Sequence, residues 1–186
     1  MNVDVVTSAF RRYVHLLMRP EEEWNLIVAE RPSLAEIVFP FTAMGIAVCF
    51  LSSLVGSLLR VEEHSLLVDI VTRPLADCGA VAAFAAVSGL VARRFGAIRP
   101  AMGEASALYS SIGIWMASVL GFIPVRALGW LWFLLGAAYA AFLYHRALDV
   151  AVGLPRHTRL KALLLSLGGL LVAGSVLRWI EQLVGG

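Results

Sequence analysis

Three ionisable residues, Asp69, Arg73 and Asp77, lie four residues apart just before a long apolar stretch. On an α-helix this spacing places their side chains on one face. If that helix crosses a membrane, the charges mark a candidate ion or proton site, because ionisable groups are costly in lipid and are usually functional there. The alternative is structural. Pro74 favours a helix start, which would leave Asp77 paired with Arg73 or Arg178 at the membrane boundary.

Hydroxyl groups in a later apolar segment extend this candidate polar site. Tyr109, Ser110 and Ser111 are consecutive within residues 104–121, the most polar of the apolar segments. If these hydroxyls line a cavity beside Asp77, the sequence predicts a small transporter or channel. That function requires water to reach the middle of the membrane.

A second group of polar residues could bind a metal ion. His145 and Asp149 are four residues apart and therefore share a helix face, and Glu104 opens a neighbouring segment. Such side chains can bind a divalent metal, although the spacing is generic. No nucleophile–base pair, phosphate-binding glycine loop or nucleotide motif is present in the sequence, so we predict no enzymatic activity and no cofactor.

The composition identifies the environment in which these residues must be positioned. Of the 186 residues, 60% are hydrophobic and 15% are charged, and the mean hydropathy of +0.82 exceeds what the core of a soluble domain requires. A net charge of +2 gives no indication of nucleic-acid binding. We therefore predict an all-α integral membrane protein. Five segments are long and apolar enough to span a bilayer: about 34–59, 74–92, 104–121, 126–148 and 160–183.

The distribution of basic residues predicts the orientation of these spans. Four Lys or Arg lie before the first span, three between the second and third, and four between or at the adjoining ends of the fourth and fifth, which is eleven of fifteen. The positive-inside rule then places the N-terminus in the cytoplasm and the C-terminus outside. Arginine strongly outnumbers lysine, which favours a GC-rich bacterial genome and hence the inner membrane.

Residues 1–32 form an amphipathic arm before the five-span bundle of residues 33–186. They lack the uninterrupted apolar stretch of a cleaved signal peptide, so we expect them to remain in the protein. Arg11 and Arg12 suit contact with an anionic membrane surface. The arm either caps the bundle or docks a protein partner, and the candidate partner contacts are Pro20, Glu21, Glu22, Glu23 and Trp24.

Pairs of small residues four positions apart predict close helix packing. Such pairs let membrane helices approach where no hydrophobic effect drives them together. They favour a compact bundle and are compatible with a homo-oligomer. The pairs include Gly79 with Ala83, Ala85 with Gly89, Gly136 with Ala140, and Gly169 with Ala173.

The order of several motifs resembles a known family. "RPEEEW" precedes the first span, "FPF" lies near its start, "RRFGAIRPAMGEASALYSS" joins the second span to the third, and "YAAFLYHRALDVAVGLP" ends the fourth. This arrangement is similar to the bacterial branch of the Yip domain family, the Ypt/Rab-interacting membrane proteins. The resemblance implies a five-helix bundle with a cytoplasmic N-terminus, self-association, and a non-enzymatic role as a membrane adaptor or organiser.

Overall fold

The computed structural model describes residues 3–59, 66–120 and 128–185. Every regular element in these ranges is helical, as the sequence predicts. The elements are α1 (Val3–Met18), α2 (Pro20–Glu30), α3 (Leu34–Ile37), the π-helical turn η1 (Val38–Thr42), α4 (Ala43–Leu59), α5 (Leu66–Arg94), α6 (Met102–Ser110), α7 (Ile112–Leu120), α8 (Leu128–Val150) and α9 (Arg156–Gly185).

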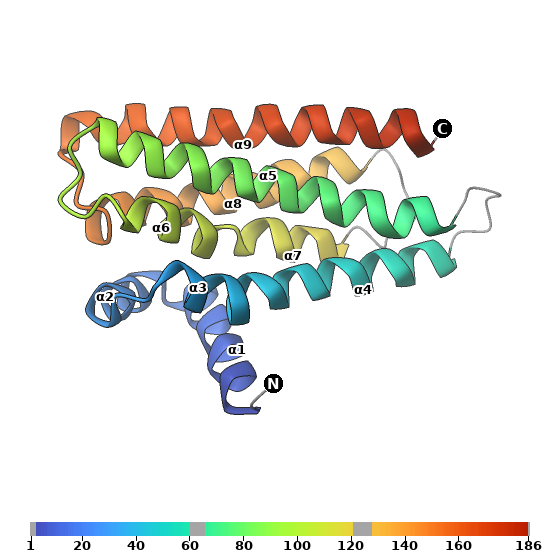
Figure 1. Ribbon diagram of the computed structural model, residues 1–186, viewed down its shortest axis with the longest axis horizontal. Helices are drawn as coiled ribbons and strands as arrows, with labels where there is room; N and C mark the ends of the chain where they lie inside the picture. Colours follow the sequence, from blue (N-terminus) through green and yellow to red (C-terminus); the bar gives the residue numbers. More distant parts are fainter. Residues whose placement is uncertain (1–2, 60–65, 121–127, 186) are drawn as a thin grey trace.

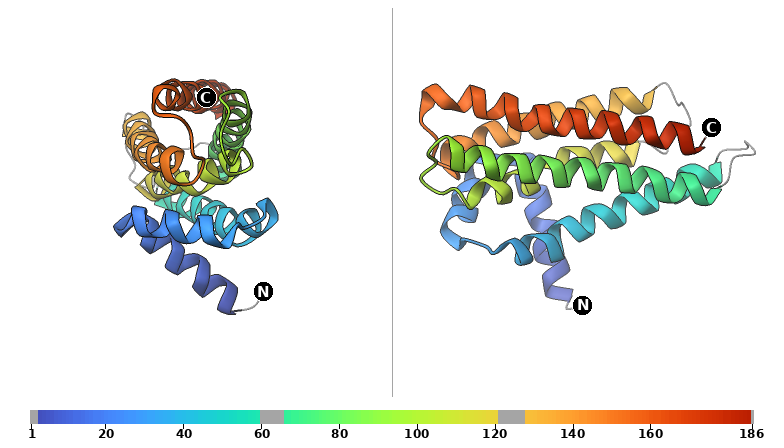
Figure 2. Two further views of the ribbon diagram at one scale, coloured as in Figure 1. Left: turned by 90° about the vertical axis from the view of Figure 1, so that its left-hand side faces the viewer. Right: turned by 45° about the horizontal axis from the view of Figure 1, so that its top comes forward.

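The long helices form one bundle with a shared axis (Figure 1). α5 packs most extensively against α9 and also contacts α6 and α4, while α7 and α8 pack against each other. The arm, α1 and α2, lies outside this bundle beside α3 and η1, and α1 points away from it (Figures 1 and 2). The connections from α5 to α6 and from α8 to α9 lie at the same end of the bundle as α2. We call this the basic end, because it carries Arg93, Arg94, Arg99, Arg146, Arg156, Arg159 and Lys161.

Among the described residues, four helical segments are long and apolar enough to cross a membrane. They are Leu34–Gly56, Ile70–Arg94, Leu131–Val150 and Arg156–Ile180. These four segments support an integral membrane protein. The predicted span at 104–121 does not form a single long helix, since it is divided at Ser111 into α6 and α7, each nine residues long.

The first apolar segment begins at Leu34, close to the predicted start, and contains a π-helical turn. Ser33 and Glu36 form a capping box. The Ser33 hydroxyl accepts a hydrogen bond from the backbone amide of Glu36, and the Glu36 carboxylate accepts one from the backbone amide of Ser33. Pro40 cannot donate a backbone hydrogen bond, and it lies in the π-helical turn η1 between α3 and α4. The hydroxyl of Tyr13 donates to the Phe41 carbonyl in this turn at 2.8 Å. The π-helical turn therefore provides a docking point for the arm.

The second apolar segment does not begin at Pro74. Instead α5 runs without interruption from Leu66 to Arg94, with Pro74 inside it. The expectation that a helix starts at Pro74 is therefore wrong. Membrane helices tolerate proline because neighbouring helices and local adjustments satisfy the freed backbone groups.

Glycines mark the closest helix crossings, as the small-residue pairs predict. A Cβ added to Gly79 or Gly169 would meet a side chain of the partner helix, Leu177 or Val87 respectively. The tightest backbone approach joins α7 to α8, where a Cβ on Gly113 would lie 2.5 Å from the Gly136 carbonyl oxygen. Backbone cannot move aside as a flexible side chain can, so these two helices require glycine at Gly113.

This crossing gives a stability prediction. We expect Gly113→Ala to destabilise the bundle by about 1–3 kcal/mol, because the new methyl group would push α7 away from α8. The matched control is Gly168→Ala on α9, where an added Cβ meets nothing within 4 Å. There the higher helix propensity of alanine should leave stability unchanged or raise it by up to about 1 kcal/mol. Thermal unfolding in detergent measures both, and equal effects would contradict the assignment of this crossing.

Candidate functional site

Asp77 on α5 forms a buried ion pair with Arg178 on α9. Only 1% of Asp77 is exposed, and its Oδ1 lies 2.7 Å from Nη2 of Arg178. The Ser118 hydroxyl of α7 donates to Oδ2, also at 2.7 Å. Both carboxylate oxygens are therefore occupied, and we call Asp77, Arg178 and Ser118 the core ion pair.

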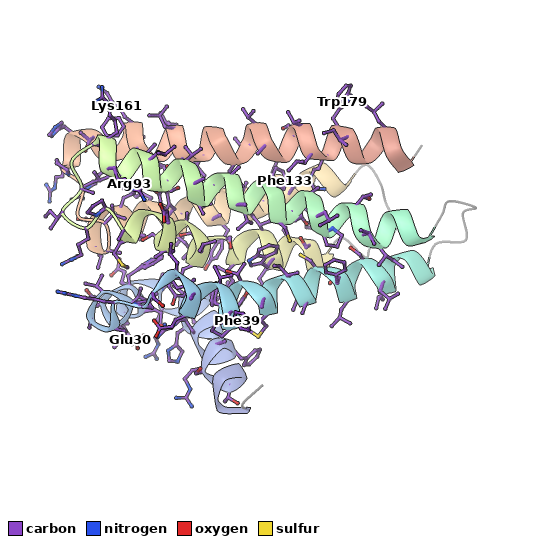
Figure 3. The ribbon with its side chains drawn as sticks, in the orientation of Figure 1. Glu30, Phe39, Arg93, Phe133, Lys161 and Trp179 are labelled. Atoms are coloured by element: carbon purple, nitrogen blue, oxygen red, sulfur yellow. The ribbon has the colours of Figure 1, made fainter. Side chains whose placement is uncertain are left out.

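The apolar surroundings of Arg178 hold its guanidinium in place. Its Cζ lies 4.7 Å from the centre of the Phe133 ring on α8, a cation–π contact. Phe133 is labelled in Figure 3, and a Cβ added to Gly174 of α9 would collide with its ring. The Nε of Arg178 is buried and has no hydrogen-bond partner among the described residues. The core ion pair thus joins α5, α7, α8 and α9 through one charged centre.

The structure brings together only part of the predicted polar site. Of the two partners expected for Asp77, it selects Arg178, while the side chains of Asp69 and Arg73 lie outside the described residues. Tyr109 is elsewhere, because Ser118, which binds Asp77, follows it by nine residues, or roughly 13 Å of helix. Tyr109 and Asp77 therefore lie at different levels of the bundle and bind different partners, Arg12 and Arg178.

The two serines after Tyr109 lie at the break between α6 and α7. The Ser111 hydroxyl donates to the Leu108 carbonyl at 2.6 Å, which satisfies it within its own turn. Ser110 is fully buried, and its hydroxyl has no partner among the described residues. Neither serine reaches the core ion pair, so these residues shape the break.

A second cluster of charged residues fastens the arm to the bundle. Arg12 of α1 donates from Nε to Glu23 of α2 at 2.9 Å, from Nη1 to the Tyr109 hydroxyl at 3.0 Å, and from Nη2 to Glu30. His15 Nδ1 lies 3.2 Å from the second oxygen of Glu23, which is only 3% exposed. We call Arg12, His15, Glu23, Glu30 and Tyr109 the arm clasp.

The electrostatics of the arm clasp keep Arg12 charged. Burial acts to lower the pKa of Arg12, but hydrogen bonds with Glu30 and Tyr109 outweigh it and raise that pKa above its ordinary value. Burial also raises the pKa of Tyr13, whose hydroxyl donates to the Phe41 carbonyl. The clasp therefore joins α1, α2 and α6 through a permanent positive charge.

Further contacts complete the docking of the arm. Trp24 is fully buried and meets the Tyr109 ring edge-on, with the ring centres 6.2 Å apart. Glu21 pairs with Arg146 of α8 at 2.7 Å, and the Tyr139 hydroxyl donates to the Leu17 carbonyl at 3.1 Å. The arm thus covers one side of the basic end.

Because the arm is docked, some residues predicted to contact lipid or a partner are turned towards the bundle instead. Arg12, Glu23 and Trp24 face the bundle, so in this conformation they do not present a surface to lipid or to a partner. Their inward orientation follows from the carboxylates and the tyrosine that surround Arg12. Arg11 and Glu22 remain exposed, Glu21 is exposed while binding Arg146, and Pro20 is half-buried.

The structure does not bring the three candidate metal ligands, Glu104, His145 and Asp149, into one site. Among the described residues, no group of three or more His, Cys, Asp or Glu side chains could hold a metal ion. Glu104 pairs with Arg93, and Asp149 pairs with Arg159 at 2.6 Å. His145 is exposed. The carboxylates of Glu104 and Asp149 form ion pairs with arginines instead of facing His145. The spacing of His145 and Asp149 in the sequence does not show these pairings.

Comparison with known proteins gives no relative from which to transfer a function. No family model, no curated protein and no solved structure matches this chain. What the protein does must therefore be inferred from its own residues. Ser118, which binds Asp77, and Phe133, which contacts Arg178, are ordinary residues of apolar helices. No sequence signal distinguishes them from their neighbours.

Proposed function

We propose that the chain is a non-enzymatic integral membrane protein of the Yip type that acts as an adaptor or organiser. The observation that carries this proposal is that the two buried carboxylates of the described residues, Asp77 and Glu23, each pair with an arginine. The core ion pair neutralises Asp77, and the arm clasp neutralises Glu23. This pairing favours a structural role for both acids.

The proposed topology has five spans. Four come from the long apolar segments, and the fifth is α6 followed by α7, which lie end to end along the bundle (Figure 1). The arginine-rich connections favour the cytoplasm for the basic end. The arm then lies at the cytoplasmic face, and the C-terminus lies outside. Residue composition favours a bacterial inner membrane.

The outer face of the arm is the proposed contact surface. Phe10 and Met18 of α1 are 62% and 77% exposed, and the cationic Arg11 lies beside Phe10. Large exposed apolar side chains next to a charge are typical of interaction surfaces. This surface replaces the buried Trp24 as the expected contact with a protein partner or with lipid.

A photocrosslinking experiment tests this surface. A photoreactive residue at Phe10 or Met18 is expected to give a discrete protein adduct in cells, and Arg11→Glu should reduce its yield several-fold by reversing the neighbouring charge. The control position is Leu165 of α9, which is exposed far from the arm and should give only lipid adducts. Equal protein adducts at all three positions, or none at the arm, would refute the adaptor proposal.

One observation favours a second candidate function, a small transporter or channel built around Asp77, Arg73 and Tyr109. The Ser106 and Ser110 hydroxyls of α6 are fully buried without a partner among the described residues, and such groups commonly bind internal water. This function requires Asp77 to take part in ion or proton movement. Asp77→Asn should then abolish the ion or pH dependence of flux in proteoliposomes, whereas an adaptor should show no flux with either residue.

A further inference from the structure

Most cations at the basic end already have partners. Arg93, Arg146 and Arg159 pair with carboxylates. Arg99 donates to the carbonyls of Val150 and Ala151. Within residues 3–59, 66–120 and 128–185, Arg94, Arg156 and Lys161 form neither an ion pair nor a hydrogen bond, and all three are exposed.

Two of these unpaired cations, Arg94 and Lys161, flank one seam, the line along which α5 packs against α9. Val87 of α5 contacts Gly169 of α9 on this line. Arg94 follows Val87 by seven residues and Lys161 precedes Gly169 by eight, so helical periodicity places both cations near the same line. Figure 3 shows Lys161 and Arg93, the neighbour of Arg94, at the same end of the bundle.

Exposed leucines lie one turn deeper in the bundle on both helices. Leu90 precedes Arg94 by four residues and is 62% exposed, and Leu165 follows Lys161 by four residues and is 52% exposed. Each helix therefore presents a cation at the end of the bundle and an apolar side chain towards its middle. The first turn of α9 contains no acidic residue that would repel an anion.

We propose that this seam binds an anionic phospholipid, with the headgroup phosphate between Arg94 and Lys161 and the acyl chains along Leu90 and Leu165. Basic sites at the ends of membrane helices attract anionic headgroups. A soluble anion would use only the cations, whereas a phospholipid also covers the leucines. The inference goes beyond an adaptor role and holds for either proposed function, since it requires only that the bundle lies in a bilayer.

Native mass spectrometry of the full-length protein in mild detergent tests the proposal. Phosphatidylglycerol is expected to bind in preference to phosphatidylcholine. The double variant Arg94→Gln/Lys161→Gln should bind phosphatidylglycerol at least about tenfold more weakly, because each cation near a headgroup contributes roughly 1 kcal/mol. The matched control is Arg19→Gln/Arg31→Gln, which removes two exposed cations of the arm and should bind like the unmodified protein.

Two further measurements keep the outcome decisive. Arg94→Lys retains the positive charge and should keep most of the binding, which separates charge from misfolding. Glycerol 3-phosphate in excess should not displace the lipid, because it lacks acyl chains. Equal binding of the two lipids, unchanged binding by the double variant, or displacement by glycerol 3-phosphate would overturn the proposed lipid site.

Discussion

Arg178→Met is expected to destabilise the bundle by about 3–5 kcal/mol, because it removes one partner of a buried ion pair. Asp77 would remain 1% exposed, and among the described side chains its remaining partner would be the Ser118 hydroxyl. An uncompensated carboxylate is costly in an apolar interior, so the helices should separate there or the acid should become protonated. Titration of the folded protein in mild detergent with sodium dodecyl sulfate measures the change in the free energy of unfolding.

Two comparisons identify the cause of that loss. In the double variant Asp77→Leu/Arg178→Met, both charges are replaced by apolar groups, and most of the stability should return. Arg156→Met removes an arginine that is exposed and forms no ion pair among the described residues, so its effect should be below about 0.5 kcal/mol. If Arg178→Met and Arg156→Met behave alike, the core ion pair is not a stabilising element of the bundle.

Arg12→Ala is expected to release the arm while the bundle stays folded. The change removes the hydrogen bonds to Glu23, Glu30 and Tyr109 together and leaves the buried Glu23 with only His15. Loss of one partner from such a buried network costs about 2–5 kcal/mol. Limited digestion with a protease that cleaves after glutamate should then cut rapidly after Glu22 or Glu30 in the released arm, and the larger fragment should persist.

Arg11→Ala is the matched control for this experiment, because Arg11 is the adjacent residue and points away from the bundle. Its cleavage rate should stay close to that of the unmodified protein. Trp24→Ala should mimic Arg12→Ala, since it empties a fully buried site between the arm and Tyr109. Equal cleavage of Arg12→Ala and Arg11→Ala would show that the arm clasp does not hold the arm.

Features encoded by neighbouring residues were predictable from the sequence. The long apolar segments follow from composition, and the capping box at Ser33 and Glu36 follows from their spacing of three residues. The irregular turn at Pro40 follows from its missing amide. In each case the residues that determine the structure lie within one or two turns of each other.

Features that depend on distant residues were not predictable in the same way. Tyr109 is 97 residues from Arg12, and Ser118 is 41 residues from Asp77, so no local pattern connects either pair. The correct partner of Asp77 was one of two arginines, and only the packing of α5 against α9 selects Arg178. The predicted helix start at Pro74 failed for a related reason. Whether a membrane helix continues through a proline depends on neighbouring helices, and these are distant in the sequence.

The distance along the chain between Arg12 and Tyr109 sets an order of events during synthesis. Translation adds roughly 5–20 residues per second, so the arm emerges roughly 5–20 s before its partner on α6. During that interval Trp24 and Glu23 have no bundle to pack against. The nascent arm therefore passes through an undocked stage, in which the residues later enclosed at the arm–bundle contact are open to the membrane surface and to other proteins.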